Sequence, residues 1–356
     1  MKNVILLGAT GQMGRFCLDA VSSSPIFNLV AISGKTNTRT IKAISYMYDV
    51  PFFTNVGEES FYDFIKRVNE VYTRDDTIAI NAVSGYSGFT ASMALVDFGY
   101  DIVLANKETI VCGGKLFLDK AKKKGSSIIP IDSEMHALKC LIEAFDKNNI
   151  SKYYITASGG PFLNLKRDEL KAIQYEDAIK HPVWKMGEKI SIDSATMVNK
   201  ALEIVEASVL FNIPSDKIET VINKEGYVHS ALQMNNGMIY PQVYKPTQKQ
   251  AIKDALGIQM QLNNEINLTS PLVLTFEKPS DERFPIIKTA MKATSNQAMA
   301  IALNASDEKA VEMFKKGEIA FNEIDEYVIK VTESYSNYKI DGFDSIDRLN
   351  NLIINS

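Results

Sequence analysis

The sequence predicts an α/β protein with three parts: a doubly wound parallel sheet over residues 1–131, an α+β catalytic domain over 132–276, and a small α-helical domain over 285–356. Three observations predict this division. Short apolar runs alternate with helical patterns in the first part, strands and helices mix in the second, and only helical windows follow residue 285. A polar, proline-containing stretch at 277–284 is typical of a linker. The length of 356 residues suits two or three domains.

The N-terminal elements follow the alternation of a parallel sheet with helices on both faces. Strands are expected at 4–7, 29–33, 78–83, 102–105 and 127–131, and helices at 14–22, 61–71 and 117–124. In the second part we expect a helix from Leu138 to Phe145, a strand at 153–157 and a helix that begins at an Asp193 or Ser194 cap. Helical windows at 287–303 and 308–314 indicate the C-terminal domain.

Charge and cysteine content restrict the possible partners and location. Lys plus Arg number 39 against 43 Asp plus Glu, so the net charge of −4 gives no basic field for a nucleic acid or an anionic membrane. No apolar stretch reaches the roughly 18 residues of a membrane span, and the N-terminal apolar run is too short for a signal peptide. Three cysteines without a CxxC pair suggest a reducing compartment. We therefore expect a cytoplasmic protein with no nucleic-acid or membrane partner.

A glycine-rich turn, Gly8 to Gly14, directly follows the first strand and opens a helix. In a Rossmann-like domain this pattern lays the pyrophosphate of a dinucleotide on a helix N-terminus. After the second strand no carboxylate is available for a ribose hydroxyl, whereas Lys35 and Arg39 suit a 2′-phosphate, which favours NADP over NAD. A turn that binds nothing, and solvated loop cations, are the alternatives.

Carboxylates recur after the last strand of the sheet and on a later helix. In an extended chain Asp132 and Glu134 point to the same side. Two like charges so close repel each other unless a cation or a proton compensates them, so the pair indicates either a metal site or a solvated helix start with Ser133 or Asp132 as the cap. Asn199, Lys200 and Glu203 lie on one face of a helix, so an amide, an ammonium and a carboxylate converge there. An ordinary ion pair between Lys200 and Glu203 on the protein surface is the alternative interpretation. Three carboxylates without thiolates suit Mg²⁺ or Mn²⁺ better than zinc.

Two further segments carry polar or aromatic groups in irregular chain. His181 and Trp184 lie in a stretch typical of a mobile lid, or of a loop anchored by a buried tryptophan. The turn Ser158-Gly159-Gly160-Pro161 follows a strand and offers donors for a phosphate, although an ordinary turn has the same composition.

Six motifs in this order are similar to those of one enzyme family. They are the Gly8–Gly14 turn, Asn106-Lys107-Glu108, Asp132-Ser133-Glu134, residues 158–162, residues 181–187 and residues 192–203. Over its whole length the chain resembles 1-deoxy-D-xylulose 5-phosphate reductoisomerase. The resemblance implies a homodimeric enzyme that uses NADPH and Mg²⁺ or Mn²⁺ to make 2-C-methyl-D-erythritol 4-phosphate from a sugar phosphate in non-mevalonate isoprenoid (terpenoid) biosynthesis.

The resemblance also implies roles for individual residues. The nucleotide would contact Thr10, Gly11, Gln12, Met13, Gly34, Lys35, Asn37, Asn106, Glu108 and Gly187. The metal would be held by Asp132, Glu134 and Glu203, which with Lys107 and His181 form the catalytic set. The substrate would contact Lys107, Ser133, Glu134, Ser158, His181, Trp184, Ser194, Asn199, Lys200 and Glu203, with Ser158, Ser194, Asn199 and Lys200 near its phosphate.

The chain departs from the family pattern at residues 223–226 and 245–250. Since no metal or phosphate position lies there, we expect altered interdomain or dimer packing and unaltered chemistry. Two other functions fit the glycine-rich opening: a semialdehyde or acyl-phosphate reductase with a nucleophilic cysteine, and an NADP-binding regulator without catalysis.

Overall fold

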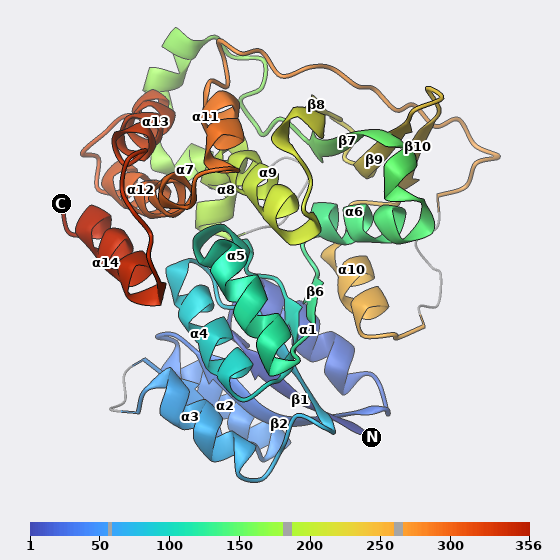
Figure 1. Cartoon of the computed structure of the whole chain (residues 1–356), viewed down its shortest axis with the longest axis vertical. Helices are drawn as coiled ribbons and strands as arrows, with labels where there is room; N and C mark the ends of the chain where they lie inside the picture. The colour runs from blue at the N-terminus through green and yellow to red at the C-terminus, as the bar shows by residue number, and fades with distance from the viewer. Residues whose placement is uncertain (56–58, 181–186, 260–265) are drawn as a thin grey trace. The chain divides into compact units, whose positions relative to one another are not determined.

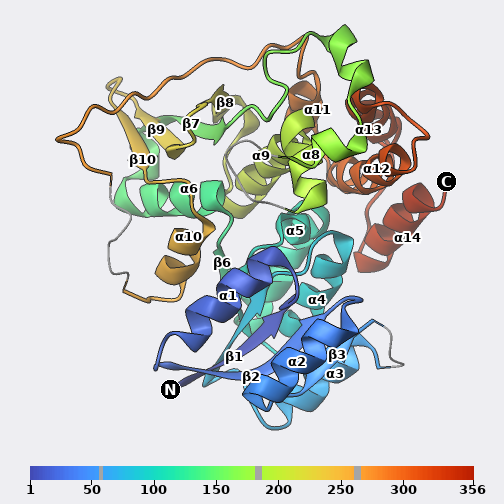
Figure 2. The same ribbon diagram turned by 180° about the vertical axis from the view of Figure 1, so that it is seen from behind.

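The computed structural model describes residues 1–55, 59–180, 187–259 and 266–356. The chain forms two compact units (Figures 1 and 2). The first comprises Met1–His136 and Thr247–Gln261, and the second Ala137–Pro246 and Leu262–Ser356. No helix within the described ranges is long and apolar enough to cross a membrane. The finer division into three domains stays a prediction.

The first unit is built on a six-stranded parallel sheet in the order β3-β2-β1-β4-β5-β6. Its strands are β1 (Lys2–Leu7), β2 (Phe27–Gly34), β3 (Phe52–Thr54), β4 (Thr77–Asn81), β5 (Asp101–Leu104) and β6 (Ile128–Pro130). This order is that of a Rossmann-like sheet, with the switch point between β1 and β4, and it confirms the predicted fold class. Strand β3 was not predicted from the sequence, because three residues are too few to show a period.

Helices cover both faces of this sheet. They are α1 (Gln12–Ser22), α2 (Thr38–Tyr48), α3 (Phe61–Asn69), α4 (Tyr86–Asp97), α5 (Lys107–Lys124) and α10 (Gln248–Ala255), and α6 (Ser133–Ala144) begins here and continues into the second unit. The predicted helix 117–124 is only the second half of α5, which starts ten residues earlier and kinks at Gly114. The kink disrupts the helical period, so the first half was not recognised.

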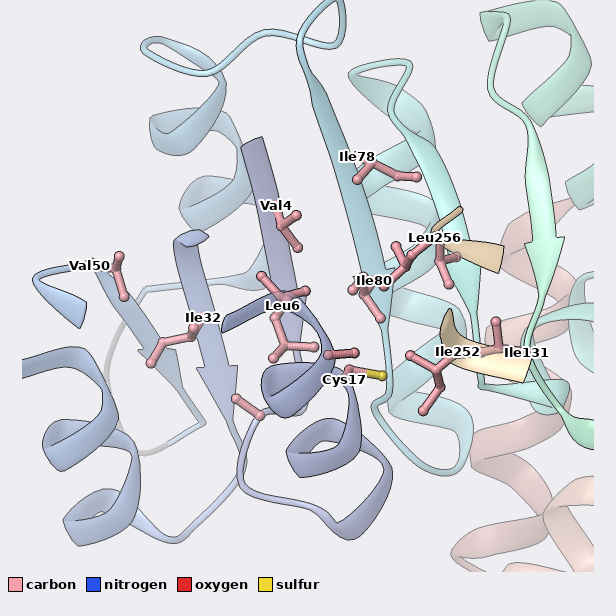
Figure 3. Close-up of a cluster of buried hydrophobic side chains, with 14 of the residues drawn as sticks. Val4, Leu6, Cys17, Ile32, Val50, Ile78, Ile80, Ile131, Ile252 and Leu256 are labelled. Atoms are coloured by element: carbon pink, nitrogen blue, oxygen red, sulfur yellow. The ribbon is translucent and has the colours of Figure 1, made fainter. Parts of the chain in front are cut away.

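The core of the first unit includes a helix that is distant in sequence. Ile252 and Leu256, contributed by α10 and the residue after it, pack with Cys17 of α1 and Ile131, which follows β6 (Figure 3). The Nε2 atom of the buried His136 and the Oδ2 atom of the exposed Asp254 are 2.9 Å apart and join α6 to α10. Helix α10 and the residues directly after it, up to Ile258, thus complete a hydrophobic core formed mainly by the first 136 residues.

The second unit combines a four-stranded mixed sheet with helices. The sheet has the order β10-β9-β7-β8, in which β7 and β8 are parallel and the other pairs antiparallel. Its strands are β7 (Ile150–Ala157), β8 (Ile218–Ile222), β9 (Val228–Met234) and β10 (Ile239–Val243). The helices are α7 (Tyr175–Ala178), α8 (Glu188–Thr196), α9 (Val198–Phe211), α11 (Ile286–Ala293), α12 (Gln297–Lys315), α13 (Ile324–Ser334) and α14 (Phe343–Ile354), with short 3₁₀ turns at 147–149, 167–172, 215–217 and 321–323. Helix α9 packs on β7 and β8 on one side and on α11 and α12 on the other.

The expected helix start at Asp193 or Ser194 is wrong. Both residues lie inside α8, and the break comes at Met197, which is buried and has a left-handed backbone with φ of +65°. A helix therefore ends and a new one starts where the sequence shows only one apolar period. The break places the N-terminus of α9 next to the C-terminal turn of α8.

The unusual residues Asn223–Gly226 pack within the second unit. The side-chain amide of Asn223 donates to Glu225 at 2.7 Å and to the carbonyl of Thr275 at 2.9 Å, and the Thr275 hydroxyl donates to Glu225 at 2.7 Å. These bonds hold the segment after β8 against residues 275–277, of which Glu277 forms a β-bridge with Ile222. Their effect on dimer packing stays a prediction.

Candidate active site

The glycine-rich turn is fixed between β1 and the end of β2. The amide of Gly8 donates to the hydroxyl of Ser33 at 3.0 Å, and the amide of Ala9 donates to the Ser33 carbonyl at 2.8 Å. Gly8 has φ of +83°, and a Cβ on Gly14 would lie 2.0 Å from the Gly8 carbonyl oxygen. Gly11 is the N-cap of α1 and leaves room for a Cβ at 3.4 Å. Only glycine fits at positions 8 and 14, because a Cβ there would overlap backbone atoms. At position 11 a Cβ would make only an ordinary van der Waals contact.

A pocket of about 110 Å³ opens beside this turn, at the carboxyl ends of β1, β2 and β4. Ligands of open α/β sheets bind at such a switch point. Four predicted nucleotide residues line it, namely Thr10, Gly11, Gly34 and Lys35. The lining also includes residues for which the sequence predicted no role: Asn55, Phe61, Ala82, Val83, Ser84 and Ser87. For the four residues within 82–87, the signal was their position directly after β4, because β4 adjoins β1 at the switch point.

Three other predicted nucleotide residues have defined structural roles. Asn37 caps α2 by accepting a bond from the Thr40 amide at 3.0 Å. Asn106 caps α5 and donates to the carbonyl of Gly85 at 3.0 Å, and Glu108 accepts from the amide of Gly85 at 2.9 Å. Asn106 and Glu108 therefore hold the loop after β4 in the shape that forms one wall of the pocket.

Lys107 and Asp132 form a nearly buried ion pair in the first unit. Their Nζ and Oδ2 atoms are 2.8 Å apart, and the side chains are 8% and 13% exposed. Glu134 accepts a bond from the Ser133 hydroxyl at 2.6 Å, and its amide donates to Asp132 at 3.3 Å. Residues 133 and 134 are helical, so the extended geometry expected for this stretch is wrong, and Asp132 caps α6. The site still gathers two carboxylates and a lysine at the end of β6.

In the second unit, the turn after β7 and the junction of α8 and α9 lie in contact. A Cβ on Gly160, whose φ is +69°, would be 2.7 Å from the Cα of Ala195 and 3.2 Å from the carbonyl of Ser194. This close approach brings the turn that contains Ser158 to the end of α8 that contains Ser194. The first turn of α9, with Asn199 and Lys200, follows directly. A helix N-terminus with serines, an amide and a lysine is suited to bind a phosphate.

The pairing of Lys200 with Glu203 is buried, so the surface-pair alternative is wrong. Lys200 and Glu203 are 4% and 1% exposed, and their side chains form an ion pair. Asn199 donates to the other carboxylate oxygen of Glu203 at 2.6 Å. A charge is costly to bury without a partner. In this cluster Lys200 and Glu203 therefore neutralise each other inside the second unit.

The remaining predicted residues are placed only in part. Gln12 and Met13 begin α1, and Gly187 is the N-cap of α8 and accepts a bond from the Ser191 hydroxyl at 2.9 Å. His181 and Trp184 lie outside the described residues, so their lid role stays a prediction.

Family profiles and related proteins identify the same family over successive parts of the chain. Family profiles described as 1-deoxy-D-xylulose 5-phosphate reductoisomerase, its C-terminal domain, and the DXP reductoisomerase C-terminal domain match residues 65–114, 128–211 and 245–352. A protein of that name from Treponema denticola is 39% identical over 94% of this chain and 90% of its own length.

Solved structures show the same fold. A DOX-P reductoisomerase in complex with NADPH, fosmidomycin and magnesium is 27% identical, with a TM-score of 0.87 over 100% of this chain and 97% of that one. The Zymomonas mobilis 1-deoxy-D-xylulose 5-phosphate reductoisomerase in complex with NADPH is 27% identical, with a TM-score of 0.82 over 99% and 97%.

Proposed function

The chain belongs to the 1-deoxy-D-xylulose 5-phosphate reductoisomerase family, and from this premise we propose that it converts 1-deoxy-D-xylulose 5-phosphate to 2-C-methyl-D-erythritol 4-phosphate with NADPH. The observation that carries the proposal is the relationship to curated enzymes of this name over almost the whole chain. The two half-sites support it, since one suits a dinucleotide and the other a phosphate. The reaction belongs to isoprenoid precursor biosynthesis.

NADPH would bind in the pocket of the first unit. Its pyrophosphate would approach the backbone at Gly11 and the N-terminus of α1. Lys35, which lines the pocket, would attract the 2′-phosphate, as would the N-terminus of α2, which Asn37 caps. Gln12, Met13, Thr10, Gly34 and Gly187 complete the proposed contacts, while Asn106 and Glu108 shape the pocket wall.

Asp132, Glu134 and Glu203 would hold a divalent cation. Their oxygen donors fit Mg²⁺ or Mn²⁺, and Lys107 and Lys200 pair with two of them, as buried carboxylates require. When bound, such a cation polarises a ketone and stabilises alkoxide charge. The nearly buried ammonium of Lys107 is held by its ion pair with Asp132. From this position it would donate hydrogen bonds to the hydroxyl and carbonyl oxygens of the substrate.

The phosphate of the substrate would bind at Ser158, Ser194, Asn199 and Lys200. This remote contact would orient the reacting carbons, where one C–C bond breaks and another forms, and the resulting aldehyde would accept hydride from NADPH. His181 and Trp184 would close over the substrate and exclude water. Ser133 would donate to the substrate from the first turn of α6.

The assembly and location of the enzyme are also proposals. We infer a homodimer from the family relationship, and a cytoplasmic location because the reaction consumes NADPH and the cysteines Cys17, Cys112 and Cys140 form no disulfide.

A reductase with a nucleophilic cysteine is less well supported. Cys17 and Cys112 are buried, and burial raises the pKa of the Cys17 thiol to about 12, so this residue stays protonated at neutral pH. A regulator without catalysis would bind NADPH with no dependence on metal.

The test follows the loss of NADPH absorbance with 1-deoxy-D-xylulose 5-phosphate, with and without Mg²⁺ or Mn²⁺, and with NADH for comparison. We expect oxidation that needs the metal and prefers NADPH. Oxidation that chelators leave unchanged and thiol alkylation abolishes would instead indicate the cysteine-dependent reductase. Binding of NADPH without any oxidation would indicate the regulator.

A further inference from the structure

Helix α8 carries Ser194 of the phosphate site and is joined to the C-terminal helices by one lysine. Lys189, in the first turn of α8, donates to Asp193 one turn later at 2.6 Å and pairs with Asp307 of α12. Asp193 immediately precedes Ser194 in the sequence. The cluster therefore links α12 to the turn of α8 that would contact the phosphate. The two helices lie side by side in the ribbon views (Figures 1 and 2).

The two carboxylates are almost completely removed from solvent. The side chains of Asp193 and Asp307 are 6% and 0% exposed, whereas Lys189 is 28% exposed. Two buried carboxylates repel each other unless a cation lies with them. Loss of the Lys189 ammonium would remove a cation that both carboxylates share, and their repulsion would then favour separation of α8 from α12, entry of water or uptake of a proton.

A shift of α8 would reach both serines of the phosphate site. The turn containing Ser158 packs on Ala195 so closely that a Cβ on Gly160 would overlap the backbone of α8. The break at Met197 lies two residues beyond this contact, and α9 with Lys200 starts there. The position of α8 thus sets the distance between the two serines and the first turn of α9.

A second ion pair joins the same two helices and provides a contrast. Glu188 of α8 and Lys315 of α12 are 3.3 Å apart, but their side chains are 60% and 49% exposed. An exposed pair of this kind is screened by water and contributes little. Of these two ion-pair contacts, the buried cluster therefore holds α8 on α12 more strongly.

We propose that Lys189 is a positioning residue for the phosphate site: through Asp193 and Asp307 it holds α8 so that Ser194 and Ser158 face the N-terminus of α9. This assignment rests on the proposed function, because it takes the phosphate of the substrate as the ligand. It gives the C-terminal helices a role in substrate binding, since Asp307 belongs to α12.

The test compares Lys189→Met with matched variants in the full-length protein. The dissociation constant of inorganic phosphate is measured by titration calorimetry, and KM and kcat are measured with the substrate. Arg167→Met is the control, because Arg167 forms a similar partly buried pair with Asp325 at 2.9 Å in the same unit. Lys315→Met removes the exposed pair between α8 and α12.

We expect Lys189→Met to weaken phosphate binding and to raise KM at least tenfold, with a smaller change in kcat. Arg167→Met and Lys315→Met should stay within threefold of wild type, and Lys189→Arg should recover most of the affinity. Asp307→Asn keeps a partner for Lys189, so it folds more readily and should lose less affinity than Lys189→Met.

Two results would overturn the assignment: phosphate affinity in Lys189→Met and Asp307→Asn equal to that of wild type, or an equal loss in Arg167→Met, which would mean a general loss of stability. Turnover by the wild type is recorded separately. If the wild type turns over and Lys189→Met binds phosphate normally, only the role of Lys189 fails. If phosphate binding falls in Lys189→Met while the wild type shows no turnover, only the proposed reaction fails.

Discussion

Replacing Gly11 and Gly14 by alanine separates cofactor binding from folding within one turn. A Cβ at Gly14 would lie 2.0 Å from the Gly8 carbonyl oxygen, more than an ångström inside ordinary contact. The atom that it meets is backbone, so α1 must shift, and such overpacking costs about 1–3 kcal/mol. At Gly11 the Cβ would lie 3.4 Å from the same oxygen, and φ of −74° suits alanine.

The stability of Gly11→Ala should therefore change little. Alanine is a poorer N-cap than glycine by about 1 kcal/mol, but it loses less backbone entropy on folding, a gain of about 0.4–1 kcal/mol that offsets most of this cost. The added methyl group would lie in the NADPH pocket, which Gly11 lines, and keep the pyrophosphate from the backbone. We expect NADPH affinity to fall at least tenfold, equivalent to about 1.4 kcal/mol.

The assays are urea unfolding for stability and fluorescence titration for NADPH affinity, on both variants and the wild type. We expect Gly14→Ala to lose stability and Gly11→Ala to lose affinity alone. Wild-type NADPH affinity in a folded Gly11→Ala protein would refute the assigned pyrophosphate position. Wild-type stability in Gly14→Ala would refute the tight contact between α1 and the turn.

Three further outcomes are expected. Glu203→Gln should abolish Mn²⁺ binding, followed by electron paramagnetic resonance, and most turnover, while NADPH affinity stays near wild type; retention of Mn²⁺ affinity would remove Glu203 from the metal site. Lys200→Ala should raise KM for the sugar phosphate at least tenfold, and an unchanged KM would argue against a phosphate contact. Because burial raises the pKa of Cys17 from 9.0 to about 12, the folded state keeps this proton while the unfolded state loses it, so stability should fall as pH rises above about 9, by roughly 2 kcal/mol at pH 10.5. Urea unfolding of Cys17→Ala at pH 8 and 10.5 should show a pH-dependent loss smaller by this amount, and an equal loss would contradict the buried thiol.

Local patterns were enough for the turn that depends on neighbouring residues. The glycine spacing from Gly8 to Gly14 predicted the dinucleotide turn, because backbone sterics act over a few residues. Asp132 and Glu134 were proposed as metal ligands because they follow a strand, and that role stays a prediction. The segment 82–87 was not found, since its part in the pocket comes from β4 lying beside β1, and that pairing joins residues more than 70 positions apart.

The sequence by itself determined the fold class, the family and the types of residue available for nucleotide, metal and phosphate binding. Only the tertiary structure decided that Lys200 and Glu203 form a buried pair, that the helix is interrupted at Met197, and that Lys189 joins α8 to Asp307. Composition and periodicity indicate only which secondary structure each segment prefers when it is considered by itself. Burial and ion pairing depend on which distant segments pack together, and this packing sets the energetic cost of each charge.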